Sequence, residues 1–291
     1  MTLVAAEWLA AHLDDPDLVV VDMRWQEDGT GRARYDAGHI PRAAFLDWST
    51  DIVDPTHPTV FMLAPPARFA EAMARTGIGN RSTVVAYADS FGSGPHRLWW
   101  ACRVYGHDNI AVLDGGLDRW IALGLPTDAD PPPAREAVWT PRGFDTQLLA
   151  GAGDVARAED DPSTVVLDSR PARQFEGRAV WFERGPLPAG DDGIARTPRG
   201  DIRAGHVPWA ASVPATELYR PDMTMKSPEE LRALFGAAGA GPEAKAITYC
   251  GVGISAAALL FALVRAGFDD VSLYDASWEE WGRDPARPVA R

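Results

Sequence analysis

One cysteine in this 291-residue chain stands where its thiol could act as a nucleophile. The stretch AITYCGVGISAAALL, residues 246–260, places Cys250 between an apolar run typical of a strand and an alanine- and leucine-rich run typical of a helix. A free thiol has a pKa of about 8.5, and at a helix N-terminus this value falls to roughly 3.5 to 7.5. We therefore expect Cys250 to be an ionised nucleophile.

The residues that follow Cys250 predict a turn that binds an anion. The predicted loop consists of Gly251, Val252, Gly253, Ile254 and Ser255. Glycine adopts positive φ values without steric cost, so both glycines suit a tight turn whose backbone N–H groups converge. We expect Ser255 to be the N-cap of the helix. The alternative is that Cys250 is a small buried hydrophobic residue, the commoner state of a lone cysteine.

The remaining cysteine and the histidines carry no comparable pattern. Cys102, in LWWACRVYG, has no glycine-rich loop beside it, and we expect it to be part of the core. Two cysteines provide neither a disulfide framework nor four thiolate metal ligands. The six histidines show no metal-ligand spacing, so we predict no metal site. The cysteine usage favours a reducing, cytoplasmic setting.

The chain repeats itself, and the repeat shows which elements position Cys250. The first half contains VVVDMR, AGHIPRA and YGHDNIAVLDGGLDRW, and the second half contains VVLDSR, AGHVPWA and AGFDDVSLYDASWEEW in the same order. So long a period indicates a duplicated domain. His39 and His206 occur in the AGH elements of both copies, including the copy without a nucleophile, so we expect them to hold a turn rather than to catalyse.

Within each copy, short β-branched runs alternate with helix-period segments, which is the pattern of a mainly parallel sheet flanked by helices. The predicted fold class is therefore α/β, with two tandem domains of this kind. We expect an N-terminal domain over residues 1–125, a proline-rich linker over 126–145 and a C-terminal domain over 146–291. Reactive groups in such sheets lie beyond the carboxyl ends of the strands, which is where Cys250 falls.

The first copy has no cysteine at the matching position. Its stretch VVAYADSFGSG places Ala88 there, followed by Asp89. We expect the second copy to be catalytic and the first, non-catalytic copy to shape the cleft between them.

Taken together, these elements resemble the tandem rhodanese family, which contains thiosulfate and 3-mercaptopyruvate sulfurtransferases. The resemblance covers nearly the whole chain, through the Asp-x-Arg and AGHxP elements of both copies and the loop CGVGIS. Its Cys-Gly-x-Gly opening is closer to the mercaptopyruvate branch than to the basic Cys-Arg-Lys-Gly loop of the thiosulfate branch. The resemblance implies that Cys250 takes sulfane sulfur from a donor, holds it as a persulfide and passes it to cyanide or another thiophile. That reaction requires no metal and no organic cofactor.

The chain departs from the family pattern around the substrate. Val252 stands where the mercaptopyruvate branch has a hydroxyl residue, so a proton relay through that side chain is absent. One of the two substrate-binding arginines of the family matches Arg199, and the other maps onto Gln174. Arg173 and Arg178 stand on either side of Gln174 and are candidates to replace the missing arginine.

The resemblance also implies an aspartate and a histidine donated by the first domain. The matching region, FLDWSTDIVDPTHPTVFMLAP, offers Asp54 and His57. For both residues the alternative is a solvated loop. The segment 178–200, rich in glycine and proline, is a candidate lid over the site.

Charge limits the partners. The net charge of −13 argues against nucleic acid or an anionic membrane surface, because phosphates would be repelled. We expect a small anionic sulfur donor and a cyanide or thiol acceptor, including a thioredoxin-like protein. No apolar run approaches the roughly 18 to 20 residues of a membrane span, and the N-terminus lacks the order of a secretory signal.

Two other functions remain open from the residues alone. One is a non-catalytic sulfur-relay or binding module, which the acidic composition and Val252 allow. The other is a cysteine-dependent phosphatase, which also places a thiolate in a strand-to-helix loop. That chemistry needs an arginine at the sixth position after the cysteine to hold phosphate, and the chain has Ala256 there.

Overall fold

The computed structural model describes residues 2–89, 92–132, 135–182 and 185–291, and the chain divides into two compact units. The first unit contains Met1–Pro55, Leu63–Asp145 and Tyr219–Met225. The second contains Thr56–Met62, Thr146–Leu218 and Lys226–Arg291. Each unit therefore includes one short segment from the other half of the sequence. The expected linker, residues 126–145, folds with the first unit, and its residues 133–134 lie outside the described residues.

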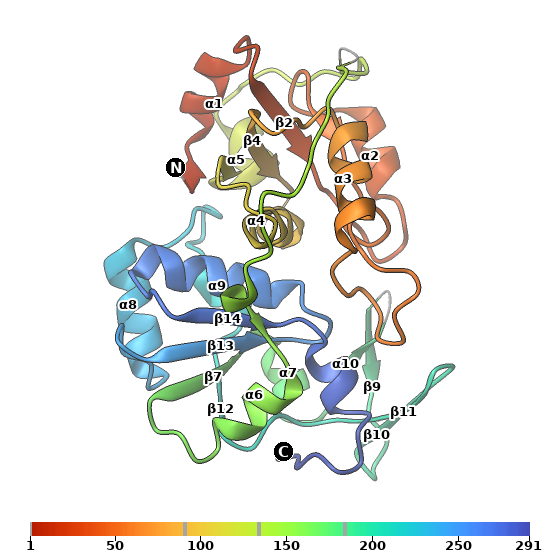
Figure 1. The fold of residues 1–291 in the computed structure, drawn as a ribbon, viewed down its shortest axis with the longest axis vertical. Coiled ribbons are helices and arrows are strands. Elements are labelled where there is room, and N and C mark those ends of the chain that lie inside the picture. Colours follow the sequence, from red (N-terminus) through yellow and green to blue (C-terminus); the bar gives the residue numbers. More distant parts are fainter. Residues whose placement is uncertain (1, 90–91, 133–134, 183–184) are drawn as a thin grey trace. The chain divides into compact units, whose positions relative to one another are not determined.

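The first unit is built on a parallel sheet of five strands in the order β1-β5-β4-β2-β3, of which β2 and β4 are labelled in Figure 1. Strands β2 and β4 are rich in valine and buried on both faces along nearly their whole length, as parallel sheets covered by helices require. The strands are β1 (Leu3–Val4), β2 (Leu18–Asp22), β3 (Ala44–Phe45), β4 (Thr83–Tyr87) and β5 (Ile110–Leu113). Its helices are α1 (Ala6–His12), α2 (Gly31–Ala37), α3 (Pro66–Arg75), α4 (Gly94–Val104) and α5 (Gly116–Ala122).

The second unit repeats this arrangement with a parallel sheet in the order β12-β7-β13-β14-β6. Its strands are β6 (Leu149–Ala150), β7 (Thr164–Asp168), β12 (Ala210–Ser212), β13 (Lys245–Tyr249) and β14 (Val271–Tyr274). Its helices are α6 (Ala152–Arg157), α7 (Ala172–Phe175), α8 (Pro228–Ala237), α9 (Ser255–Ala266) and α10 (Ser277–Trp281), with 3-10 turns η1 (Thr146–Leu148) and η2 (Ala215–Leu218). The predicted fold, α/β with two tandem copies, is confirmed.

Side-chain alternation along β13 connects the sheet to both helical layers. Ile247 and Tyr249 face a core that includes Val155 of α6 and Trp278 of α10. Helix α9, buried along most of its length, packs against β13 and β14, and α8 packs against α9. The loop that joins β13 to α9 is therefore held by the core at both of its ends.

In both copies the arginine of the Asp-x-Arg element pairs with its aspartate and donates a hydrogen bond of 2.7 Å to the carbonyl oxygen of the glycine in the Ala-Gly-His element. The residues are Asp22, Arg24 and Gly38 in the first copy and Asp168, Arg170 and Gly205 in the second. The rings of His39 and His206 stack on Tyr35 and Phe175, and each Nδ1 bonds the carbonyl oxygen of the residue on which it stacks. Both histidines hold turns.

The second unit also contains two antiparallel hairpins that have no counterpart among the described residues of the first. They are β8 (Ala179–Phe182) with β9 (Gly185–Pro188), and β10 (Ile194–Thr197) with β11 (Gly200–Arg203). The predicted lid, residues 178–200, is this region, and its residues 183–184 lie outside the described part of the chain. Among the described residues, every helix is too short or too polar to span a lipid bilayer.

Candidate active site

The thiol of Cys250 lies at the carboxyl end of β13, the central strand of the second sheet. Strands β7 and β14 pair with β13 on its two sides, so the loop after β13 lies at the edge where parallel sheets carry their sites. Cys250 is 3% exposed. The sequence predicts Cys250 directly after a strand, and in the structure it follows the last residue of β13.

The backbone of Cys250 is held by residues at the start of α10. The N–H of Cys250 donates to Oγ of Ser277 at 3.0 Å, and the carbonyl oxygen of Cys250 accepts from the N–H of Trp278 at 3.0 Å. The N–H of Glu279 donates to the carbonyl oxygen of Gly251 at 2.9 Å. The N–H of Cys250 is therefore not one of the donors that the loop can offer to an anion, since Ser277 accepts it.

The rest of the loop has donors to offer. Within the described part of the chain, four backbone N–H groups of the loop donate to no protein acceptor; they belong to Gly251, Val252, Ile254 and Ser255. They lie just before and at the N-terminus of α9, where unpaired N–H groups and the helix dipole both favour negative charge. A small anion in front of this loop would receive several hydrogen bonds at once.

Two details of the predicted loop are corrected. Ser255 is the first residue of α9, and the N-cap is Ile254, which has no side-chain acceptor. The Ser255 hydroxyl instead pairs with the hydroxyl of Ser169 at 2.9 Å. Gly253 has the expected positive φ of 79°, whereas Gly251 does not. Glycine is needed at position 251 because a Cβ there would lie 2.7 Å from Cβ of Trp181.

Arg199 belongs to the same compact unit as Cys250 and stands in the turn between β10 and β11. Its Nη2 donates to the carbonyl oxygen of Pro58, and its Nε lies 3.7 Å from Oε1 of Glu279. The Arg199 side chain is 37% exposed, and its Nη1 makes no hydrogen bond to any described residue. This guanidinium can therefore bind an incoming anion.

Glu279 is a buried acid that the sequence prediction did not single out. It is 2% exposed, and its Oε1 accepts from Nε of Arg283 at 2.8 Å. Its Oε2 is buried without a hydrogen-bond partner among the described residues. A carboxylate in this position pairs with two arginines and is joined by its own N–H to the loop of Cys250.

The candidates around Gln174 lie on or next to α7. Gln174 is buried, whereas Arg173 and Arg178 are exposed. Arg178 forms an ion pair with the exposed Glu176. Among the described residues, neither arginine forms a hydrogen bond or ion pair with the loop of Cys250.

The residues expected from the first half of the chain fall in different units. His57 lies in Thr56–Met62, the segment that folds with Cys250 and Arg199, and its ring is exposed, with Nδ1 accepting from the N–H of Thr59. Asp54 belongs to the first unit. The neighbour of His57, Pro58, is the residue that contacts Arg199.

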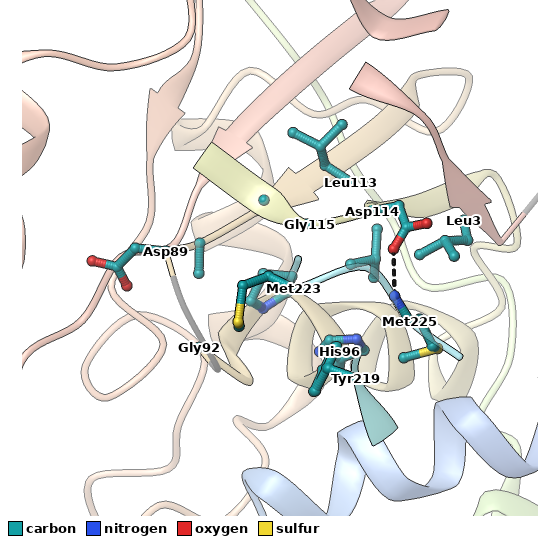
Figure 2. A pocket seen from close by; sticks show the side chains of 14 residues that line it. Leu3, Asp89, Gly92, His96, Leu113, Asp114, Gly115, Tyr219, Met223 and Met225 are labelled. Atoms are coloured by element: carbon teal, nitrogen blue, oxygen red, sulfur yellow. Dashed lines mark hydrogen bonds between the residues drawn. The ribbon is translucent and has the colours of Figure 1, made fainter. Parts of the chain in front are cut away.

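In the first copy, Ala88 occupies the place of Cys250 at the end of β4. A cavity of about 30 Å³ at this end of the sheet is lined by Ala88, Asp114 and three residues of Tyr219–Met225, the segment contributed by the second half of the sequence (Figure 2). Asp114 Oδ1 accepts from the N–H of Met225 at 2.7 Å. Burial raises the pKa of the nearby Asp89 carboxyl. Residues 90–91 of this loop lie outside the described residues.

Cys102 has the setting expected of a core residue. It is fully buried in α4, and burial raises the pKa of its thiol well above the ordinary value. A thiol that stays protonated and covered is unreactive. The described residues include no group of three or more His, Cys, Asp or Glu side chains arranged to hold a metal ion.

The fold and the site define a two-copy α/β protein in which one copy alone has a thiol in its central strand-to-helix loop. Residues 5–123 and 152–284 match the family described as Rhodanese-like domain. The chain therefore belongs to the rhodanese family, in its two-domain form, which confirms the resemblance drawn from the sequence.

Relatives with three different names align with nearly the whole chain. A 3-mercaptopyruvate sulfurtransferase from Escherichia coli K12 is 33% identical over 98% of this chain and 96% of its own length. A thiosulfate sulfurtransferase from Cricetulus griseus is 33% identical over 96% of this chain and 91% of its own. The sulfur carrier protein TtuD of Thermus thermophilus is 30% identical over 99% of this chain and 96% of its own.

Solved structures agree. The crystal structure of SseA from Escherichia coli, described as a 3-mercaptopyruvate sulfotransferase, superimposes with a TM-score of 0.80 at 31% identity and covers 96% of this chain and 99% of its own. Two of the relatives' names specify a donor, and they differ: one gives 3-mercaptopyruvate and the other thiosulfate.

Proposed function

We propose that this sulfurtransferase moves a sulfur atom from a small anionic donor to a thiophilic acceptor through a persulfide on Cys250. The observation that carries the proposal is the loop after β13, in which Cys250 precedes four backbone N–H groups that donate to no acceptor in the described part of the chain. Such donors stabilise negative charge on a leaving group and on the persulfide.

The electrons of the proposed reaction balance without a redox partner. The Cys250 thiolate attacks the donor sulfur, a sulfur–sulfur bond forms, and the bond from that sulfur to the rest of the donor breaks with its electron pair. From 3-mercaptopyruvate the remnant is the enolate of pyruvate, which takes a proton to become pyruvate; from thiosulfate it is sulfite. A thiolate or cyanide then attacks the outer sulfur and returns the electron pair to Cys250.

We propose 3-mercaptopyruvate as the preferred donor. The loop residues 251–255 contain no cation, and Arg199 is the one arginine of the family pair that this chain retains. A single guanidinium matches the single carboxylate of 3-mercaptopyruvate. Because Val252 has no proton to relay, the enolate is protonated by solvent or by a group other than the side chain at position 252.

Four further residues are proposed to contribute to the donor site. For His57 the support is its place in the segment that contacts Arg199. For Asp54, Arg173 and Arg178 it is the family resemblance alone. We assign residues 146–291 to the catalytic domain, 1–125 to a non-catalytic domain and 126–145 to the linker between them.

A sulfur relay to a protein acceptor is the second candidate. It is favoured by the 30% identity to the Thermus sulfur carrier protein, which spans nearly the whole chain. In this role the persulfide on Cys250 would pass its sulfur to a thiol of a thioredoxin-like protein. We propose the cytoplasm as the setting for either reaction. The phosphatase alternative is not retained, because the family is that of the rhodaneses.

The test is to incubate the protein with 3-mercaptopyruvate and locate added sulfur by mass spectrometry. We expect one sulfur atom on the peptide that contains Cys250 and none on that of Cys102. Cys250→Ser should abolish transfer to cyanide with an unchanged thermal transition, and Cys102→Ser should retain transfer. An unmodified Cys250 after exposure to both 3-mercaptopyruvate and thiosulfate contradicts the catalytic proposal.

A further inference from the structure

The buried carboxylate of Glu279 lies between the predicted donor-binding arginine and a second arginine. Its Oε1 is 2.8 Å from Nε of Arg283 and 3.7 Å from Nε of Arg199. Its backbone N–H is bonded to the carbonyl oxygen of Gly251 in the nucleophile loop. Glu279 is thus tied to both parts of the proposed donor site.

Arg283 is less available to a donor than Arg199, because each of its three guanidinium nitrogens already donates to a protein acceptor. Its Nε donates to Glu279, its Nη1 donates to the carbonyl oxygen of Gly200 at 2.8 Å, and its Nη2 donates to Oγ1 of Thr197 at 3.3 Å. These contacts hold the turn between β10 and β11, in which Arg199 stands. Of the two arginines, Arg199 alone keeps a nitrogen, Nη1, without a hydrogen bond to any described residue.

The guanidinium groups of Arg199 and Arg283 and the carboxylate of Glu279 form a cluster with one net positive charge near the nucleophile loop. Within this cluster the Glu279 side chain is 2% exposed. The carboxylate repels an incoming anion in proportion to the charge of that anion. The repulsion is stronger than in water because the carboxylate is buried. Oε2 of Glu279 has no hydrogen-bond partner among the described residues, so no donor screens this oxygen from an incoming anion.

We propose that Glu279 tunes the choice of sulfur donor by charge, because it lowers the affinity for a dianion such as thiosulfate more than the affinity for a monoanion such as 3-mercaptopyruvate. The proposal deepens the proposed function and rests on it in one respect, that Arg199 binds the donor. Glu279 acts on the donor through the field at Arg199, so it is a positioning and selecting residue rather than a catalytic one. Each additional negative charge on the donor meets the same repulsion once more.

The test replaces the charge and keeps the shape. Glu279→Gln retains an oxygen that accepts from Arg283, whereas Glu279→Asp retains the charge on a shorter side chain. We expect Glu279→Gln to raise the ratio of kcat/KM for thiosulfate to that for 3-mercaptopyruvate about tenfold, mainly through KM. Glu279→Asp should keep a ratio close to that of the unmodified protein. Glu280→Gln is the matched control, because this exposed neighbour accepts from the Tyr274 hydroxyl instead.

A binding measurement separates this inference from the proposed function. Calorimetric titration with sulfate, a dianion, and pyruvate, a monoanion, requires no turnover. We expect the ratio of the sulfate Kd to the pyruvate Kd to fall about tenfold in Glu279→Gln and to stay constant in Glu280→Gln. An unchanged ratio, or a protein that binds neither anion, overturns the role of Glu279. A shifted ratio in a protein that forms no persulfide supports Glu279 and overturns the proposed reaction.

Discussion

The Oγ atom of Ser277 accepts a hydrogen bond of 3.0 Å from the backbone N–H of Cys250. The same hydroxyl donates to the carbonyl oxygen of Tyr274 at 2.8 Å, and Ser277 has a φ of +51°. A non-glycine residue in this region is strained, so the surrounding contacts must stabilise it. One fully buried serine therefore fixes the backbone of the nucleophile.

Comparison with the first copy shows that the hydroxyl of Ser277 is particular to the second copy. Aligning YGHDNIAVLDGGLDRW with AGFDDVSLYDASWEEW places Gly116 opposite Ser277, and Gly116 has a φ of +55°. The next residue, Leu117, donates its N–H to the carbonyl oxygen of Ala88, as Trp278 does to Cys250. Both copies thus have the same turn, and only the copy with the cysteine places a hydroxyl in it.

Ser277→Ala should lower the free energy of unfolding by about 1–3 kcal/mol, because the buried N–H of Cys250 loses its acceptor. Ser277→Gly loses the same acceptor but relieves the positive φ, and should be more stable than Ser277→Ala by about 1 kcal/mol. Urea denaturation of the two variants and of the unmodified protein measures both differences. Equal stability of Ser277→Ala and the unmodified protein contradicts the role of the hydroxyl.

Gly251→Ala should lower both stability and transfer activity. The added Cβ would lie 2.7 Å from Cβ of Trp181, so the loop or strand β8 must move, at a cost of about 1–3 kcal/mol. Gly236→Ala is the matched control, since a Cβ at this position of α8 meets open space and should stabilise the helix by up to about 1 kcal/mol. Unfolding curves and kcat/KM of both variants test the contrast, which fails if the two substitutions act alike.

Much of the fold follows from local sequence, because the duplicated elements perform the same task in each copy. In each copy, an arginine two residues after a strand-end aspartate donates to the carbonyl oxygen of a glycine far along the chain. Because both copies make this contact, the Asp-x-Arg and Ala-Gly-His elements occur in both halves of the sequence. Cys250 could be placed at a strand end because a buried β-branched run precedes it and an apolar helix follows.

Other parts of the site depend on contacts between segments far apart in the chain. Nothing near Gly251 in the sequence indicates that Trp181 packs on it. The glycine and proline content of segment 178–200 predicted a candidate lid, and it does not indicate that the described residues of this segment belong to two antiparallel strand pairs. The pairing of Glu279 with Arg199 likewise appears only when α10 and the β10–β11 turn meet. For the contact between Ser277 and Cys250 the sequence does contain a signal, because the second copy has Ser277 where the first copy has a glycine.

Arg199→Ala should raise KM for an anionic donor more than it lowers kcat, because the guanidinium binds donor and transition state alike. Arg196→Ala is a matched control on the same hairpin. Arg196 is already paired with Asp192 through a hydrogen bond of 2.8 Å, so its removal should leave KM within about twofold. Steady-state kinetics with 3-mercaptopyruvate distinguish the two; a fall in kcat alone for Arg199→Ala contradicts the assignment.

A fully buried histidine links stability to pH in the first unit. His96 lies in α4 beside the ring of Tyr219, with ring centroids 6.4 Å apart, and burial lowers its pKa to about 3. In the unfolded chain the same ring has its ordinary pKa of about 6.5. Between these two values the unfolded state therefore binds one proton more than the folded state does.

The free energy of unfolding should consequently fall as the pH is lowered from about 6.5 toward about 3, by about 1.4 kcal/mol per pH unit from this residue alone. His96→Leu removes that proton uptake, so its stability should depend less steeply on pH over this window even if the substitution changes stability at neutral pH. Burial also lowers the pKa of His107, a contribution that persists in the variant and cancels in the comparison. Urea unfolding at several pH values measures the slopes; identical slopes for His96→Leu and the unmodified protein would show that His96 is protonated in the folded state.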